Sequence, residues 1–319
     1  MYYTPPMAQT PTETTLLRIG SRGSALALVQ AREVQGRLAK ACGLPAERIE
    51  IKVIRTTGDM IQDRPLAEAG GKGLFTKEIE EALMAGAIDL AVHSSKDMPT
   101  VLPAGLILSA FLPREDARDA FVSRKAKSLR ELPHGAVVGT ASLRRQALVK
   151  RLRPDLAIAP LRGNVETRLR KIEAGEMDAT VLAVAGLKRL GLLAAATAVL
   201  DTDEFLPAVG QGAIGIETQA DDARTRALVA KIDDADTAIA LAAERAFLAV
   251  LDGSCRTPIA GYARVSGGGI RFRGMIAKTD GSEALEVLRD GPAADAAALG
   301  ADAGRELKDR AGPGFFVRD

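Results

Sequence analysis

Short apolar runs alternate with stretches of helical periodicity from about residue 16 to residue 220. The helical stretch 24–43 begins at an N-cap serine and ends at a glycine, and a second one at 76–86 also ends at a glycine. The apolar runs have the length of buried strands. They are residues 49–54, 87–94, 136–140, 156–161 and 179–186. This alternation predicts an α/β fold with mainly parallel sheets covered by helices on both faces.

The pattern is too long for one domain. A segment rich in proline and charge, 112–121, interrupts it, and the Pro and Gly residues within 203–219 indicate a second crossover back to the first domain. After about residue 231 a long helix at 236–250 is followed by a cysteine loop, paired strands and a final helix. We therefore expect two α/β domains and a small α+β third domain. The predicted ranges are 1–112 with 213–230 returning to it, 113–212, and 231–319.

The composition limits the function classes. Of 319 residues, 47% are hydrophobic and only 3% aromatic, which suits a soluble protein with Ala, Leu, Val and Ile in its cores. The charged residues are interspersed along the chain and give a net charge of only +2. They therefore give no support for nucleic acid or a membrane surface as a partner. Because the N-terminus lacks the basic and apolar regions of a secretion signal, we expect a cytoplasmic protein.

The two cysteines, Cys42 and Cys255, have different surroundings. Neither belongs to a CxxC motif or a cysteine/histidine cluster, so we expect no structural metal site, and the metal prediction for the chain is none. Cys42 lies near a helix end and is expected to pack. Cys255 lies in the loop "LDGSCRTP", where packing explains a cysteine poorly. The residues alone leave a disulfide, a metal ligand, a nucleophile and a covalent anchor open.

Three predicted strand-to-helix junctions combine small residues with arginine. Helix N-termini beside guanidinium groups bind carboxylates and phosphates, although a surface arginine after an ordinary N-cap explains any one junction. Three such junctions at strand ends favour an anion-binding site in a crevice. Without a phosphate loop or a GxGxxG turn, carboxylates are the better ligand. The junctions hold Arg22 and Ser24; Thr140, Ser142, Arg144 and Arg145; and Arg162, Gly163, Asn164 and Arg168.

Polar residues also follow the predicted strand at 87–94. The sequence "HSSKD" at 93–97 includes Lys96 and Asp97. In a crevice lined by arginines, the Asp97 carboxylate is expected to stay ionised and to stabilise a cation or transfer a proton. A solvated turn at the strand end is the alternative for Lys96 and Asp97, and His93 is expected to be a hydrogen-bonded structural residue.

The motifs together resemble one family. "GSRGSALALVQA", "TTGD", "GGKGLFTKEIE", "AVHSSKDMP", "VGTASLRRQ", "PLRGNVETRL", "PAVGQGAIGIE" and "LDGSCRTPI", in this order, are similar to the porphobilinogen deaminase family from about Leu17 to near the C-terminus. The resemblance implies a transferase of tetrapyrrole biosynthesis, a monomer that joins four porphobilinogen molecules head to tail, with release of ammonia, into hydroxymethylbilane. It also implies that the first two domains are like periplasmic binding proteins and that a dipyrromethane cofactor is bound covalently.

The resemblance further implies residue roles. Asp97 matches the catalytic aspartate, and Cys255 matches the cysteine whose thioether carries the dipyrromethane. The other cofactor-binding positions are Ser94, Lys96, Thr140, Ser142, Arg144, Arg145, Arg162, Gly163 and Asn164. The substrate-binding positions are Arg22, Ser24, Lys72, Phe75, Arg168, Arg189 and Gln211. The departures from the family pattern are small: Ser95, Ala141 and Ser254 stand where methionine, serine and glycine are frequent.

Two other function classes stay possible at this point. The same architecture serves non-catalytic anion-binding proteins, which need neither Cys255 nor Asp97. A nucleotide-dependent enzyme is the weakest alternative, because the sequence has neither a phosphate loop nor a paired-acid metal motif.

Overall fold

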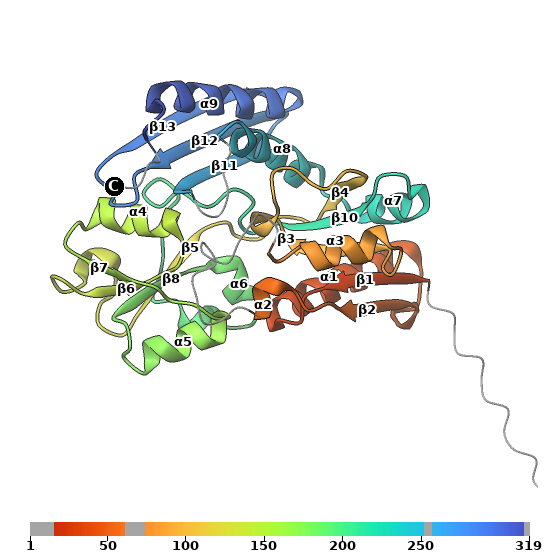
Figure 1. The fold of residues 1–319 in the computed structure, drawn as a ribbon, viewed down its shortest axis with the longest axis horizontal. Helices are drawn as coiled ribbons and strands as arrows, with labels where there is room; N and C mark the ends of the chain where they lie inside the picture. The colour runs from red at the N-terminus through yellow and green to blue at the C-terminus, as the bar shows by residue number, and fades with distance from the viewer. Residues whose placement is uncertain (1–15, 61–73, 252–256, 316–319) are drawn as a thin grey trace, which may run out of the picture.

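The computed structural model describes residues 16–60, 74–251 and 257–315. In this part of the chain the strands form three sheets. Two of them lie side by side, and the third lies against both with its two helices (Figure 1). No helix in the described ranges is long and apolar enough to cross a membrane. The observed class is the mixed α/β fold that the sequence predicts.

The first sheet has the strand order β2-β1-β3-β10-β4. Only β10 runs antiparallel to its neighbours, and it is the strand that returns from the second sheet. The strands are β1 (Leu17–Ser21), β2 (Ile49–Val53), β3 (Leu90–Ser94), β4 (Leu106–Phe111) and β10 (Ile214–Gln219). The helices are α1 (Ala25–Cys42), α2 (Thr57–Met60), α3 (Lys77–Met84) and α7 (Ala223–Val229).

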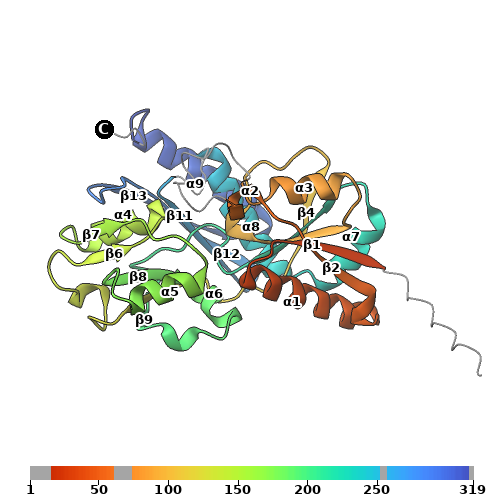
Figure 2. The ribbon, with the colours of Figure 1, turned by 60° about the horizontal axis from the view of Figure 1, so that its bottom comes forward.

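The second sheet repeats this arrangement with the order β7-β6-β8-β5-β9. Here β5, the first strand after the chain leaves the first sheet, is the antiparallel one. The strands are β5 (Asp119–Ser123), β6 (Val137–Gly139), β7 (Ala157–Ala159), β8 (Ala179–Ala183) and β9 (Ala198–Val199). The helices are α4 (Leu143–Leu152), α5 (Val165–Glu173) and α6 (Val184–Arg189). In both sheets, the carboxyl ends of the parallel strands face the neighbouring sheet (Figure 2).

The third sheet is an antiparallel meander of β11 (Ile259–Ser266), β12 (Gly269–Ala277) and β13 (Ala284–Pro292). It packs against α8 (Ala235–Val250) and α9 (Ala296–Ala311), with Phe247 and Phe272 in contact at its centre. Gly300 lets α9 approach α8 closely, because a Cβ there would lie 2.0 Å from the carbonyl oxygen of Ala243. This sheet and its two helices carry an apolar core of their own.

Most predicted elements are confirmed, with differences at their ends. Helix α1 has the predicted cap, since Ser24 accepts a hydrogen bond from the Ala27 N–H, and Gly43 ends it at φ +63°. The run 179–186 divides into a strand and a helix at Val184. The link expected at 112–121 is shorter, because β5 already begins at Asp119. The exact domain ranges stay a prediction.

The two crossovers, 112–118 and 200–213, lie side by side. The Glu115 N–H donates to the Gly212 carbonyl at 3.3 Å, and Arg114 Nε donates to the Gln211 carbonyl at 2.9 Å. The buried side chain of Gln211 also donates to the Ala117 carbonyl at 2.7 Å. The crossovers thus form one hydrogen-bonded connection between the two larger sheets.

Candidate active site

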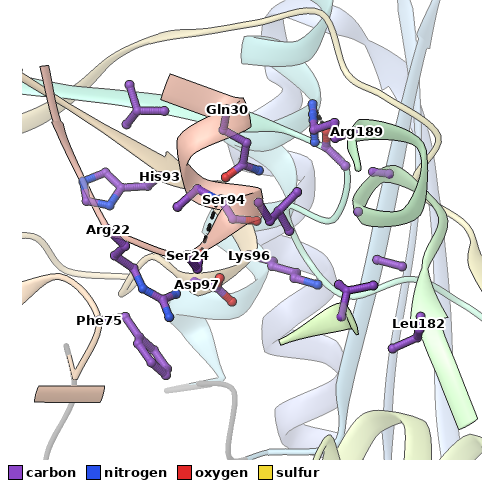
Figure 3. Close-up of a pocket in the computed structure, with 18 of the residues that line it drawn as sticks. Arg22, Ser24, Gln30, Phe75, His93, Ser94, Lys96, Asp97, Leu182 and Arg189 are labelled. Carbon is purple, nitrogen blue, oxygen red and sulfur yellow. Dashed lines mark hydrogen bonds between the residues drawn. The ribbon is translucent and has the colours of Figure 1, made fainter. Parts of the chain in front are cut away.

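A cleft opens between the two five-stranded sheets, at the ends of their parallel strands. It is lined by the turn after β1, the end of β3, and the first turns of α1, α4, α5 and α6 (Figure 3). Nine of the predicted site residues line it: Arg22, Ser24, Phe75, Ser94, Lys96, Asp97, Arg145, Arg168 and Arg189. The structure therefore brings together residues that are up to 167 positions apart, as Arg22 and Arg189 illustrate.

Arg22 follows the last residue of β1 and is held by two neighbours. Its guanidinium forms a forked ion pair with the Asp59 carboxylate, with Nε at 3.1 and 3.2 Å from the two oxygens. The same guanidinium lies 4.2 Å from the centre of the Phe75 ring. Burial opposes ionisation of Asp59, but Arg22 and the Thr56 hydroxyl together hold the pKa of this carboxyl below its ordinary value.

The end of β3 continues into a short 3-10 turn, η2 (Ser95–Asp97), which lies against the second crossover. The Ser95 N–H donates to the Ala213 carbonyl at 3.0 Å. Gly210, at φ +73°, allows this close approach, because a Cβ there would lie 2.9 Å from the backbone nitrogen of Lys96. The turn and the crossover thus fix the backbone that carries Lys96 and Asp97.

Lys96 and Asp97 stand at the centre of the cleft. In the view of Figure 3, the Asp97 carboxylate lies between Arg22 and Lys96. Burial, followed by repulsion from Arg145, lowers the pKa of the half-buried Lys96 ammonium to about 8. Asp97 is exposed and is the only carboxylate among the described residues that line the cleft. Among the described lining residues it is therefore the one acid that a ligand between these cations would meet.

Helices α4 and α5 of the second sheet carry arginines that line the cleft with Lys96 and Asp97. Arg168 on α5 is half-buried, and burial, followed by repulsion from Arg145, lowers its pKa to about 10. Arg145 on α4 donates to Asp119 Oδ1 at 3.0 and 2.7 Å. Burial opposes ionisation of Asp119, but Arg144 and Arg145 outweigh it and hold the pKa of Asp119 at about 2.

Arg144, predicted as a cofactor ligand, does not line the cleft. It is buried, lies 2.9 Å from Asp119 Oδ2, and donates to the Leu206 carbonyl at 2.8 Å. The structure thus places Arg144 where it fastens α4 to β5 and to the second crossover.

Arg189, at the end of α6, closes one side of the cleft. It lies 3.5 Å from the Glu33 carboxylate on α1 and donates to the Gly212 carbonyl at 3.1 Å. Burial lowers its pKa, while Glu33 acts in the opposite direction. This arginine therefore connects the second sheet's helices to α1 and to the crossover.

Other predicted residues shape the turns behind the cleft lining. Thr140 accepts from the Ser142 N–H at 3.1 Å, and Ser142 caps α4. Asn164 caps α5 by accepting from the Thr167 N–H at 2.8 Å. The Gly163 carbonyl accepts from Arg168 Nε at 2.9 Å. Arg162 is half-buried in the same turn, close enough to lower the pKa of Arg168.

Two predicted residues, Lys72 and Cys255, lie outside the described residues. The predicted Gln211 is buried between the crossovers and is not part of the lining. Cys42 contacts the core of the first sheet, as expected.

Sequence reasoning missed several residues at the cleft. Gln30 lines it from α1 and is buried, with Ala31, Val34 and Leu38, on the face that α1 turns to the core. A polar residue at a core position of an amphipathic helix was the signal that could have found it. His93 also lines the cleft and pairs with the buried Glu217 at 3.0 Å, as the structural interpretation of this histidine predicts.

The charges of the cleft suit a ligand with several carboxylates. Arg22, Arg145 and Arg189 each have a carboxylate partner within the protein. Within the described ranges, Lys96 and Arg168 make no ion pair shorter than 4 Å, and the pKa of each is lowered by burial. A ligand carboxylate that binds these two cations relieves the cost of burying them.

Two family models match the chain. The model described as "Porphobilinogen deaminase, dipyromethane cofactor binding domain" matches residues 17–227, and the model "Porphobilinogen deaminase, C-terminal domain" matches residues 238–309. A curated relative from Nitrobacter hamburgensis, named porphobilinogen deaminase, is 65% identical over 97% of this chain and 98% of its own length. A relative of the same name from Paracoccus denitrificans is 57% identical over 97% and 99%.

Solved structures with similar folds are more distant. The crystal structure of a nutrient-binding protein from Burkholderia cenocepacia bound to methionine is 14% identical, with a TM-score of 0.41, and the match covers 67% of this chain and 90% of that one.

Proposed function

The chain belongs to the porphobilinogen deaminase family, and we propose that the cleft between its two larger sheets is where hydroxymethylbilane is made. The activity is the head-to-tail condensation of four porphobilinogen molecules with release of ammonia, in tetrapyrrole biosynthesis. A non-catalytic anion-binding protein of the same architecture is not favoured, because relatives that match over nearly the full length are porphobilinogen deaminases.

The position of Asp97 in the cleft supports a catalytic role for its carboxylate. In each condensation the aminomethyl C–N bond of the incoming porphobilinogen breaks, and a C–C bond forms between its methylene carbon and the free ring carbon of the pyrrole that receives it. The ring carbon then loses its proton, so that ammonium leaves overall. The departure of ammonia leaves a cation spread over the pyrrole, which an adjacent carboxylate stabilises. Asp97 is the only acid of the described lining and is therefore proposed to stabilise this cation and to take up the ring proton.

The cations are proposed to bind the substrate carboxylates. Each porphobilinogen carries one acetate and one propionate, so a growing chain brings two more negative charges with each ring. Arginine forks and a lysine ammonium match such groups. We assign this binding to Arg22, Lys96, Arg145, Arg168 and Arg189, while Ser24, Ser142 and Asn164 fix the turns that present them.

The cleft also suits the dipyrromethane cofactor of the family, which bears carboxylates of the same kind. The half-buried ammonium of Lys96 forms no ion pair in the described ranges, and a carboxylate of the cofactor would supply its partner. When bound, the cofactor supplies a pyrrole carbon as the acceptor for the first substrate ring. We propose that Cys255 carries it as a thioether and that Ser94, Lys96 and Arg145 hold its carboxylates.

The observation that supports this role is that Asp97 is the single carboxylate among the described residues that line the cleft, and the Asp97→Asn variant tests it. We expect kcat for porphobilinogen consumption to fall by about 10²–10⁴, the range lost when a general acid or base is removed. The matched control is Asp155→Asn, whose carboxylate pairs with Arg153 away from the cleft, and it should stay within twofold of the parent enzyme. Turnover of Asp97→Asn at the control level would remove Asp97 from the mechanism.

The cofactor attachment has an independent test. Intact-mass measurement of the protein purified from cells that make porphobilinogen should show an excess equal to two linked pyrrole units. Cys255→Ala should lack this excess. An unmodified mass for the parent protein, or an unchanged excess in the variant, would contradict the assignment of Cys255.

We also propose that the enzyme acts as a cytoplasmic monomer without nucleic acid or membrane partners. The interspersed charges and the net charge of +2 support the absence of nucleic acid and membrane partners. Light scattering during gel filtration at assay concentrations should give the mass of one chain, 33.5 kDa. A stable dimer mass would contradict the proposal.

A further inference from the structure

The Arg22 guanidinium holds a carboxylate of the protein itself. Asp59, in the four-residue helix α2, accepts hydrogen bonds from Nε and Nη2 of Arg22. The Phe75 ring lies against the guanidinium at 4.2 Å from its centre. Both Arg22 and Phe75 line the cleft, whereas Asp59 does not. Among the described residues, the contact of Asp59 with the cleft lining is therefore made through Arg22.

Asp59 is itself fixed by its own segment. The hydroxyl of Thr56, which is fully buried, donates to Asp59 Oδ2 at 2.8 Å. The Gly58 N–H donates to the Leu74 carbonyl at 2.7 Å. A Cβ at Gly58 would lie 2.4 Å from the Phe75 ring, so the two segments are in close contact. Asp59 and Phe75 thus belong to one packed unit that holds the guanidinium.

The fork leaves part of the arginine available. An arginine presents five N–H groups, and Asp59 uses the edge formed by Nε and Nη2. Within the described residues, Nη1 donates no hydrogen bond, and a quarter of the Arg22 side chain remains exposed. A second carboxylate can therefore bind the edge formed by Nη1 and Nη2 while Asp59 stays in place.

We propose that Asp59 is a positioning residue, which orients Arg22 so that this free edge receives a carboxylate of porphobilinogen. The inference rests on the proposed function. Its physical basis is preorganisation: a guanidinium that is already oriented loses less rotational freedom when the substrate binds. The opposite hypothesis is that Asp59 competes with the substrate for Arg22. The second bond from Thr56 and the packing around Gly58 favour positioning, because they hold Asp59 in place independently of Arg22.

The two hypotheses predict opposite changes in KM. In Asp59→Asn the charge that fixes Arg22 is lost, and we expect KM for porphobilinogen to rise roughly tenfold, with kcat within about twofold. Asp59→Glu, which restores the carboxylate, should recover part of this loss. Thr56→Val removes only the supporting hydrogen bond and should raise KM by a smaller factor.

A matched control lies at the other end of the same strand. Asp89 forms an equivalent fork with Arg18, at 3.0 and 2.6 Å, outside the cleft lining. Asp89→Asn should lower thermal stability without changing KM. If Asp59→Asn fails to fold, the comparison of Asp59→Glu and Thr56→Val with this control decides the question.

The outcomes separate this inference from the proposed function. A lower or unchanged KM in Asp59→Asn would overturn the positioning role, the lower value in favour of competition. Arg22→Gln tests the proposed function itself, because it should raise KM whatever Asp59 does. If Arg22→Gln raises KM and Asp59→Asn does not, only the inference about Asp59 fails. If neither does, Arg22 does not bind the substrate.

Discussion

Glu244 is the carboxylate whose loss we expect to destabilise the protein most. It lies on α8, is fully buried, and receives a fork from Arg114, with Nη2 at 3.1 Å from Oε2. It also accepts from the Gly210 N–H at 2.7 Å and from the Ala263 N–H at 2.8 Å. One side chain thus joins the third sheet and its helix to both crossovers.

The magnitude follows from the burial of both partners. The Arg114 side chain is only 11% exposed, so in Glu244→Gln its charge would be left buried and unpaired. Breaking such a pair costs about 3–5 kcal/mol. The glutamine amide group also replaces one acceptor by a donor, which leaves at least one of the backbone N–H groups without a partner. At about 2 °C per kcal/mol for a chain of this size, Tm should fall by about 6–10 °C.

Thermal melting followed by circular dichroism measures this shift. The matched control is Glu306→Gln on α9, whose carboxylate also receives two arginines, Arg289 and Arg310, but at the surface. Exposed pairs contribute about 0–1 kcal/mol, so its Tm should change by less than about 2 °C. If the two variants melted together within 2 °C of the parent protein, burial of the Arg114–Glu244 pair would not stabilise the fold.

Three further predictions concern pH and backbone geometry. Because the pKa of Asp119 is lowered to about 2, its ion pairs stabilise the protein above about pH 4, and this contribution of about 2 kcal/mol is lost as pH falls toward 2. The difference in urea-unfolding free energy between the parent and Asp119→Asn should therefore become smaller below pH 4. A difference that stays constant with pH would contradict this role of Asp119. With the pKa of Lys96 lowered to about 8, its charge is lost as pH rises through 8. KM for porphobilinogen should then rise, but not in Lys96→Arg, and parallel profiles would refute the role of this charge. Gly210 has φ +73°, and Gly210→Ala places a Cβ 2.9 Å from the backbone nitrogen of Lys96. The control Gly135→Ala has nearly the same φ, +72°, but open space around the new Cβ. Urea unfolding should show a larger loss for Gly210→Ala than the roughly 1 kcal/mol expected for the control, and equal losses would exclude the contact.

Local signals were enough to predict where helices begin and strands lie. Ser24 caps α1 because its hydroxyl can accept a backbone N–H three residues later, a contact that depends only on nearby residues. The order of the strands was not predictable in the same way. β10 inserts between β3 and β4, more than a hundred residues earlier, and neither its composition nor its spacing specifies these neighbours.

The site could be predicted as a set of residue types but not as a set of pairs. Arg144 and Arg145 are adjacent in one motif, and both contact Asp119, yet only Arg145 lines the cleft. Neighbours on a helix point about 100° apart, so which of the two faces the ligand depends on how α4 packs. The partners Asp59 and Glu33 were missed for a related reason, because each meets its arginine only after the chain has folded.

The pairing of the cleft cations has a consequence for how a polyanionic product is built. Arg22, Arg145 and Arg189 carry resident carboxylates, which weaken their attraction for a ligand, whereas Lys96 and Arg168 have no such partner within 4 Å in the described ranges. Both unpaired cations interact electrostatically with Asp97. We infer that the first carboxylates to enter bind Lys96 and Arg168, because burial has already made these charges costly and a ligand charge offsets that cost. The pyrrole that bears them would thereby lie beside Asp97, the one acid of the described cleft lining, where we propose that the C–N bond breaks.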